Sequence, residues 1–206
     1  MLGVAILIVV MSVMNGFKTD LTKKILGLNP HIVIQPNNFK IEDSFIENLE
    51  KTIKNIDISK TYSGEGIVVS RDNAKGIIIK GVDIKNKKTL NFFEQNISSG
   101  SIDNFKRNTA FIGTELSFNL NLKVGDKINL MSSAFVATPF GGLPKQETLT
   151  IAGVFNTGFF EFDQNFVFLN LSDALSIFDK EIYEQNLEIY LSDPMKADGL
   201  KKELKK

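Results

Sequence analysis

The chain opens on a stretch without a single charged side chain. Residues 1–17 read MLGVAILIVVMSVMNGF, and as a helix they would extend roughly 25 Å, slightly less than the ~30 Å hydrocarbon core of a bilayer. A signal peptide fits less well, because it would carry a basic start and a small-residue cleavage site. A buried helix of a water-soluble protein stays open. We favour the end of a first transmembrane helix over residues 1–17, with its beginning upstream.

The next stretch is apolar on one side only. Leu21, Ile25 and Leu28 recur at helical spacing among lysines, which predicts an amphipathic helix that continues outward as a stalk over residues 18–30. Asn29-Pro30 is a pair that ends helices. The stalk is therefore expected to stop there.

Strand and helix patterns alternate along the rest of the chain. A β-branched run at 31–35, a helical pattern over 41–54 and further β-branched runs predict a β-α-β-β opening, which is typical of an α+β layer with one helix on a small sheet. Residues 88–101 look looser, and the middle of the chain is mostly β. The predicted elements are strands at 66–70, 76–82, 127–131, 148–155, 166–169 and 187–191, a strand and helix over 109–122, a helix at 173–178, and a helix that begins at Pro194 and is still helical at Lys206.

Charge and composition exclude several classes of protein. Lys+Arg and Asp+Glu both number 24, so no basic stripe favours nucleic acid. With no cysteine and one histidine, His31, thiolate sites and zinc sites with several histidines are excluded, and a Ser-His-Asp set would depend on His31 alone. No phosphate-binding loop of the G-x-x-x-x-G-K-[ST] type occurs. We therefore expect no enzyme, metal or cofactor. His31 is expected to be structural, and Glu161 and Asp163 are expected in a solvated turn between strands.

One segment stands out by its prolines and glycines. Residues 137–146 read ATPFGGLPKQ, and two prolines with two glycines do not fit a regular ladder. The pattern predicts a long projecting loop between two strands, with Phe140 and Leu143 at its tip. Apolar side chains on a projecting loop are unfavourable unless a partner covers them. A loop folded back on its own sheet and a partner-binding loop both stay open on physical grounds.

Several strings are similar to one family of membrane proteins. S-V-M-N-G-F at 12–17 and L-N-P-H at 28–31, with Gly113-Thr114-Glu115-Leu116 and Val124-Gly125-Asp126, resemble the LolC/LolE family, the permease subunits of the bacterial lipoprotein-releasing ABC transporter with its MacB-like periplasmic domain. The resemblance covers the whole chain. The first two strings are fairly specific, whereas the Val-Gly-Asp turn is shared by many permeases.

The resemblance implies a two-lobed domain in the periplasm, anchored in the bacterial inner (cytoplasmic) membrane. Residues 31–83 would begin an α+β lobe, 84–180 would form an inserted, mostly β lobe, and 181–206 would return to the first lobe, truncated before further membrane helices beyond Lys206. In the LolC branch a β-hairpin called the hook recruits a periplasmic carrier. The T-P-x-G-x-x-P-x-Q pattern resembles that hook, which implies a LolC-like subunit, although a single hybrid permease stays open. The implied hook residues are Thr138, Pro139, Phe140, Gly141, Gly142, Leu143, Pro144, Lys145 and Gln146.

Partners and a substrate follow from the same resemblance. It implies a LolD-like cytoplasmic ATPase, a LolE-like second permease or a second copy of this chain, a LolA-like periplasmic carrier and a lipoprotein substrate. Where the family often has a basic hook residue, this chain has Gly142, and Lys145 is expected to supply the charge. The residues expected near the lipoprotein are Met11, Met14, Asn15 and Phe17. The alternatives are a MacB-like efflux or mechanotransmission permease and an FtsX-like regulator of a cell-wall hydrolase.

Overall fold

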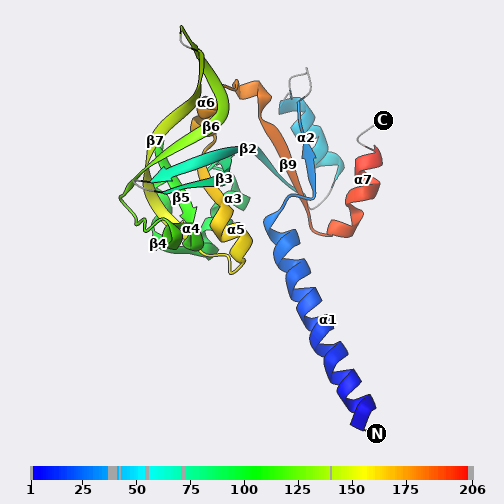
Figure 1. Ribbon diagram of the computed structural model, residues 1–206. Coiled ribbons are helices and arrows are strands. Elements are labelled where there is room, and N and C mark those ends of the chain that lie inside the picture. Colours follow the sequence, from blue (N-terminus) through cyan, green and yellow to red (C-terminus); the bar gives the residue numbers. More distant parts are fainter. Residues whose placement is uncertain are drawn as a thin grey trace.

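The chain folds into a mixed α+β body from which one long helix projects (Figure 1). The computed structural model describes residues 2–36, 41, 43–53, 56–70, 73–139 and 141–203. Helix α1 (Leu2–Leu28) runs unbroken through both the apolar stretch and the predicted stalk, and it ends before Asn29-Pro30 as predicted. In the part of the chain whose placement can be described, no helix is both long and apolar enough to cross a membrane.

A single nine-stranded sheet organises the body, and the predicted α+β class is confirmed. The strand order is β1-β9-β2-β3-β8-β5-β7-β4, with β6 paired to β2 and β7. The strands are β1 (Ile32–Ile34), β2 (Ile56–Ser70), β3 (Asn73–Val82), β4 (Ile97–Gly100), β5 (Thr109–Gly113), β6 (Lys127–Thr138), β7 (Gly141–Phe155), β8 (Phe166–Asn170) and β9 (Asn186–Leu191).

Strand β2 takes part in three ladders, with β9, β3 and β6. Residues Ile56–Thr61 pair antiparallel with β9, and Thr61–Ser70 pair antiparallel with β3. We call the part built on the first ladder the base lobe: β1, helix α2 (Asp43–Thr52), β2 as far as Thr61, β9 and helix α7 (Ala197–Glu203). Residues 62–185 are called the β-rich lobe. The domain boundaries predicted at 83/84 and 180/181 stay predictions.

Apolar side chains fill each lobe separately. The base lobe has a small cluster around Ile32, Leu49 and Ile189. One cluster of the β-rich lobe consists of aliphatic residues with Phe178, and the other is dominated by phenylalanines, among them Phe93, Phe111, Phe155 and Phe168. His31 is structural, as predicted, because its Nδ1 accepts a hydrogen bond from the backbone N–H of Leu191 at 2.8 Å.

Two local predictions outside the proline-glycine segment were wrong. Residues 88–101 are not loose: they contain helix α3 (Lys87–Asn96), capped by Asn86, and then β4. Phe92 and Phe93 anchor this helix in the phenylalanine cluster, where Phe93 is fully buried.

The remaining short helices are α4 (Thr114–Asn119), α5 (Phe160–Asn165) and α6 (Leu171–Ile177), with 3-10 turns at Ile102–Asn104, Ile182–Glu184 and Pro194–Lys196.

The second wrong prediction concerns the carboxylate pair. Glu161 and Asp163 lie in α5, not in a solvated turn, and Asp163 is buried. Its carboxylate accepts hydrogen bonds from the backbone N–H of Thr157 at 3.0 Å and from the Thr157 hydroxyl at 2.7 Å. Because a buried carboxylate needs such partners, Asp163 serves to hold the segment that leads into α5.

Candidate functional site

Strands β6 and β7 form a hairpin that extends beyond the rest of the sheet. The ladder continues to Thr138 paired with Gly141, so the segment predicted as a long loop is largely a two-stranded ribbon. Strand β2 pairs with β6 only as far as Ser132. From there to its turn the hairpin has no third strand among the described residues, and it projects from the body (Figure 1). We call residues 133–146 the free hairpin.

An irregular β-bulge lies at the base of the free hairpin. Met131 pairs with Gln146 and Phe135 pairs with Pro144, so three residues of β6 lie opposite Lys145 alone. Such a bulge bends a ribbon and increases its twist. The free hairpin therefore leaves the sheet in a direction of its own.

Three polar contacts fix this base to helix α6 and the segment after it. The buried hydroxyl of Ser132 donates to the carbonyl oxygen of Ile177 at 2.5 Å. The ammonium of Lys145 donates to Asp179 at 3.0 Å, and the hydroxyl of Ser176 donates to Glu147 at 3.1 Å. The charge of Lys145 is therefore held at the hairpin base, away from the turn.

The free hairpin exposes apolar side chains on both of its faces. Phe135 lies opposite Pro144 and its ring lies beside Gly142, whereas Val136 and Leu143 form the next pair. Because successive residues of a strand point to opposite faces, the two pairs lie on different faces. Phe135, Val136 and Leu143 are 66%, 47% and 60% exposed. Neither face of the hairpin packs its apolar side chains against the body.

The predicted hook residues lie together on this hairpin. Thr138 ends β6, Pro139 is exposed in the turn, and Gly141 begins β7 with a φ of 118° that favours glycine. The prediction for Phe140 falls outside the described residues, as does the side chain of Thr138. The remaining members, Gly142, Leu143, Pro144, Lys145 and Gln146, follow along β7.

The predicted lipoprotein-binding residues lie at the other end of the molecule. Met11, Met14, Asn15 and Phe17 are exposed on α1, whose free end points away from the hairpin (Figure 1). Every large apolar side chain described between Val4 and Phe17 is at least 50% exposed. A helix that is apolar all round is normally covered by lipid or by other helices.

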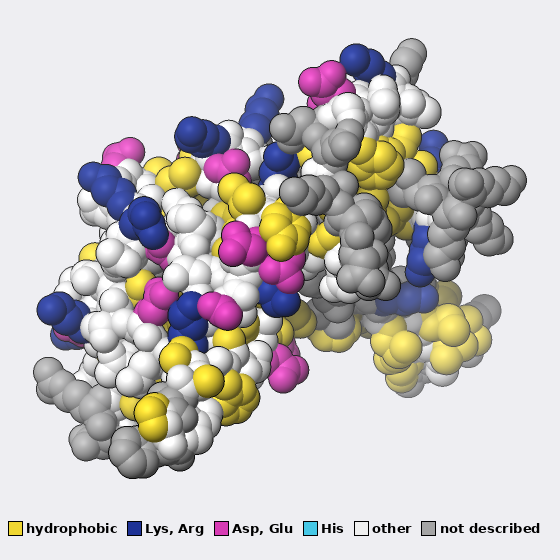
Figure 2. Space-filling view, turned by 90° about the horizontal axis from the view of Figure 1, so that it is seen from above, with side chains coloured by type: hydrophobic (Ala, Val, Ile, Leu, Met, Phe, Trp, Pro, Cys, Tyr) yellow, Lys and Arg dark blue, Asp and Glu magenta, His cyan; other side chains and the backbone are white. Residues whose placement is uncertain are grey.

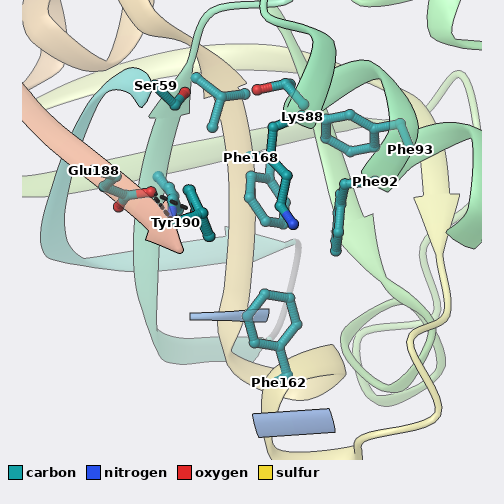
Figure 3. Close-up of a pocket in the computed structure, with 11 residues that line it drawn as sticks. Ser59, Lys88, Phe92, Phe93, Phe162, Phe168, Glu188 and Tyr190 are labelled. Carbon is teal, nitrogen blue, oxygen red and sulfur yellow. Dashed lines mark hydrogen bonds and ion pairs between the residues drawn. The ribbon is translucent and has the colours of Figure 1, made fainter. Parts of the chain in front are cut away.

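A small cavity of about 40 Å³ lies where the two lobes meet (Figure 3). Phe92, Phe93, Phe162 and Phe168 line it from the β-rich lobe, and Glu188 and Tyr190 line it from β9. Such a space holds a few water molecules at most. No group of metal-ligating side chains occurs among the described residues.

An ion pair crosses this junction. The ammonium of Lys80 on β3 donates to Glu188 on β9 at 2.9 Å, and both side chains are buried. The hydroxyl of Tyr190 donates to the same carboxylate oxygen at 2.8 Å (Figure 3). Burial, and then the neighbouring Glu188 carboxylate, raise the pKa of Tyr190 above its ordinary value. Tyr190 therefore remains a hydrogen-bond donor at neutral pH.

The surrounding surface carries mixed charge. Viewed onto the side from which the hairpin projects, basic and acidic side chains are interspersed over the body, and apolar side chains form several separate patches (Figure 2). A surface without one dominant sign does not steer a strongly charged polymer. The exposed apolar residues of the hairpin therefore indicate a binding surface more specifically than the mixed surface charge does.

A family model described as the MacB-like periplasmic core domain matches residues 1–206. The chain belongs to this family. It is 25% identical over 205 residues to "Lipoprotein-releasing system transmembrane protein LolC" of Neisseria meningitidis serogroup B, covering 97% of this chain and 49% of that protein. It is 26% identical over 207 residues to the protein named LolE of Haemophilus influenzae, covering 97% and 50%. The LolC/LolE resemblance is confirmed, and the chain spans about half the length of these relatives.

Two further comparisons point to similar proteins. The chain is 24% identical over 179 residues to the LolC of Xylella fastidiosa (strain Temecula1), covering 85% of this chain and 43% of that protein. Among solved structures, the periplasmic region of MacB from Actinobacillus actinomycetemcomitans is similar with a TM-score of 0.49 and 13% identity, covering 84% of this chain and 78% of that one.

Sequence reasoning missed the junction between the lobes of this MacB-like domain. It never singled out Lys80, Glu188 or Tyr190, although a signal existed. Lys80 stands inside the run GIIIKGV, and a lysine amid a buried strand normally needs an acidic partner. It also missed Phe135 and Val136, because they precede the proline-glycine segment that defined the predicted hook.

Proposed function

We propose that this chain is the periplasmic part of a non-catalytic permease subunit of an ABC transporter. In this proposal the transporter releases lipoproteins from the bacterial inner membrane and hands them to a soluble periplasmic carrier. Membership of the MacB-like periplasmic core domain family and similarity to proteins named LolC and LolE support it. The energy would come from a separate LolD-like ATPase, and a LolE-like subunit or a second copy of this chain would complete the permease.

The free hairpin is the proposed docking element for the LolA-like carrier. The observation that carries this assignment is the exposure of Phe135, Val136 and Leu143 on a ribbon that leaves the sheet. Burying such side chains in a partner is worth about 1.5–3 kcal/mol each when complete. Because the base of the hairpin is fixed to α6, the ribbon offers these side chains without first losing much conformational freedom.

Helix α1 is the proposed contact with lipid. Its exposed Met11, Met14 and Phe17 would face the acyl chains of the lipoprotein near the outer leaflet, with Asn15 at the interface. Methionine adapts to varied apolar shapes. Each buried acyl CH₂ is worth about 0.8 kcal/mol, so extraction of a lipoprotein requires coupling to ATP hydrolysis.

A carrier pull-down tests the docking proposal. Leu143→Ser and Val136→Ser should each weaken capture of the carrier about tenfold or more, because an apolar contact is lost at the interface. Replacing residues 139–144 with a Gly-Ser linker should abolish capture. Phe118→Ser is the matched control, since Phe118 is 82% exposed but lies on α4. Unchanged capture by the hairpin variants would contradict the docking assignment.

The purified permease separates this proposal from its rivals. A lipoprotein-releasing subunit should retain lipoprotein, whereas a MacB-like efflux permease or an FtsX-like hydrolase regulator should carry none. Replacing Met11 and Met14 with asparagine should reduce the retained lipoprotein. Absence of lipoprotein from the unsubstituted complex would count against lipoprotein release and favour the efflux alternative.

A further inference from the structure

In the part of the chain that the structure describes, the two lobes are joined by polar contacts and share no buried apolar cluster. Among the described residues, each of the three buried apolar clusters stays within one lobe. Across the junction the Lys80–Glu188 ion pair joins β3 to β9, and the amide of Asn86 donates to the carbonyl oxygen of Ile58 at 2.7 Å. Polar interfaces between parts of one chain are the ones at which relative motion is expected.

Strand β2 is one of two covalent connections at this junction, and the other is the return of the chain from Gln185 into β9. Thr61 is the one residue that the β9 ladder and the β3 ladder share. Its hydroxyl is also the one buried side-chain polar atom, among the residues described, that has no hydrogen-bond partner. A buried hydroxyl without a partner favours any state that exposes it to water. The unpaired hydroxyl therefore lowers the free-energy cost of opening the strand where the two ladders meet.

The ion pair opposes opening at that point. Lys80 and Glu188 lie on the two strands that flank β2, so their contact spans β2 close to Thr61. Tyr190 donates to Glu188 from the same strand, and the ammonium of Lys88 lies 4.9 Å from the centre of the Tyr190 ring. A buried pair is only weakly stabilising overall, but the loss of one partner leaves an uncompensated charge. Such a contact holds one arrangement and releases sharply once it is broken.

We propose that the Lys80–Glu188–Tyr190 cluster is a latch between the two lobes, with Thr61 of β2 as the hinge. With the latch closed, the lobes keep the arrangement seen in the structure. When the latch opens, the small cavity beside Phe92 and Phe168 admits water to the ion pair, and the β-rich lobe turns against the base lobe. The free hairpin moves with the β-rich lobe, to which it is anchored.

Hydrogen exchange on the 206-residue chain tests the latch. Lys80→Met should raise the exchange of amides in residues 56–61 and 186–191 about tenfold or more, because the unpaired Glu188 favours opening. Amides of β5 and β8 inside the β-rich lobe should keep their rates. Lys80→Met with Glu188→Leu removes both charges and should return the junction to near its original protection.

Lys75→Met is the matched control, because Lys75 also lies on β3 but its ammonium donates to Gln164 within the β-rich lobe at 3.1 Å. It should leave the junction amides unchanged. Equal acceleration in both lobes on Lys80→Met would show a merely structural pair and overturn the proposal, as would no acceleration at all.

A distance measurement checks the motion itself. The chain has no cysteine, so spin labels at Glu47→Cys in the base lobe and Phe118→Cys in the β-rich lobe report on their separation. Lys80→Met should add a second distance population that the double variant with Glu188→Leu removes. An identical single distance in all variants would contradict the hinge.

Discussion

The hydroxyl of Ser132 donates a 2.5 Å hydrogen bond to the carbonyl oxygen of Ile177, and this contact lies where β6 parts from β2. On the sheet side of Ser132, β6 has a neighbour at each edge. On the other side it has only β7. A two-stranded ribbon is marginal by itself, so the stiffness of the free hairpin depends on this anchor.

Ser132→Ala should therefore loosen the hairpin more than it destabilises the protein. Loss of the buried hydrogen bond should lower the free energy of unfolding by about 1–2 kcal/mol. Limited proteolysis and amide exchange within residues 133–138 should speed up, while exchange in β5 stays the same. Ser133→Ala, at the adjacent exposed position, should change neither, and the same loosening there would argue against the anchor.

Asp163→Ala tests the buried carboxylate of α5. The backbone N–H and the hydroxyl of Thr157 would both lose their acceptor, which should reduce the free energy of unfolding by about 1–3 kcal/mol. Chemical denaturation measures the loss. Glu161→Ala, at an exposed site on the same helix, should lie within about 0.5 kcal/mol of the original protein. Equal effects of both substitutions would refute the role assigned to Asp163.

Gly113→Ala should be among the most damaging single substitutions. A Cβ at Gly113 would overlap the backbone of Asp163, where α5 packs on the end of β5, and backbone cannot move aside as a side chain can. We expect the free energy of unfolding, measured by thermal melting, to fall by about 1–3 kcal/mol or more, or the variant to fail to fold. Gly76→Ala has open space around its new methyl group and should be nearly neutral in the same thermal melt.

The raised pKa of Tyr190 predicts that the stability of the protein depends on pH in the alkaline range. Its pKa in the folded protein is raised by burial, whereas the unfolded chain titrates near pH 10. Above that pH the unfolded state loses a proton that the folded state keeps, so the free energy of unfolding falls as pH rises. Tyr190→Phe should flatten this fall between about pH 10 and 11. An unchanged slope in denaturant titrations would show that Tyr190 is not responsible.

Most of the fold could be predicted from the sequence because the spacing of apolar residues within each segment determines whether that segment is a helix or a strand. The run GIIIKGV became β3, and the apolar opening with its lysine-rich continuation became one helix. The segment around Pro144 was predicted wrongly because a proline without an N–H was judged unfit for a ladder. Past Ser132 each strand of the ribbon has a free edge, and at an edge the missing N–H removes no ladder bond.

The candidate sites were predictable only in part. Leu143 could be found because the prolines and glycines that mark its segment lie next to it in the sequence. The partner of Lys80, in contrast, lies more than a hundred positions away, at Glu188. Likewise, the burial of Asp163 depends on how α5 packs against β5. Pairings of this kind come from tertiary packing, which the spacing of one segment does not encode.

Thr61 and Asn186 are register partners in the antiparallel β2–β9 ladder, so the chain leaves the base lobe and returns to it at adjacent points. A short hairpin turn from Lys60 to Leu187 could close the base lobe on its own ladder. The residues between these two positions therefore form an insertion that could be replaced as a unit. Sites of this kind tolerate large insertions. The same base lobe could thus carry a different projecting lobe without any change to the strands that hold it.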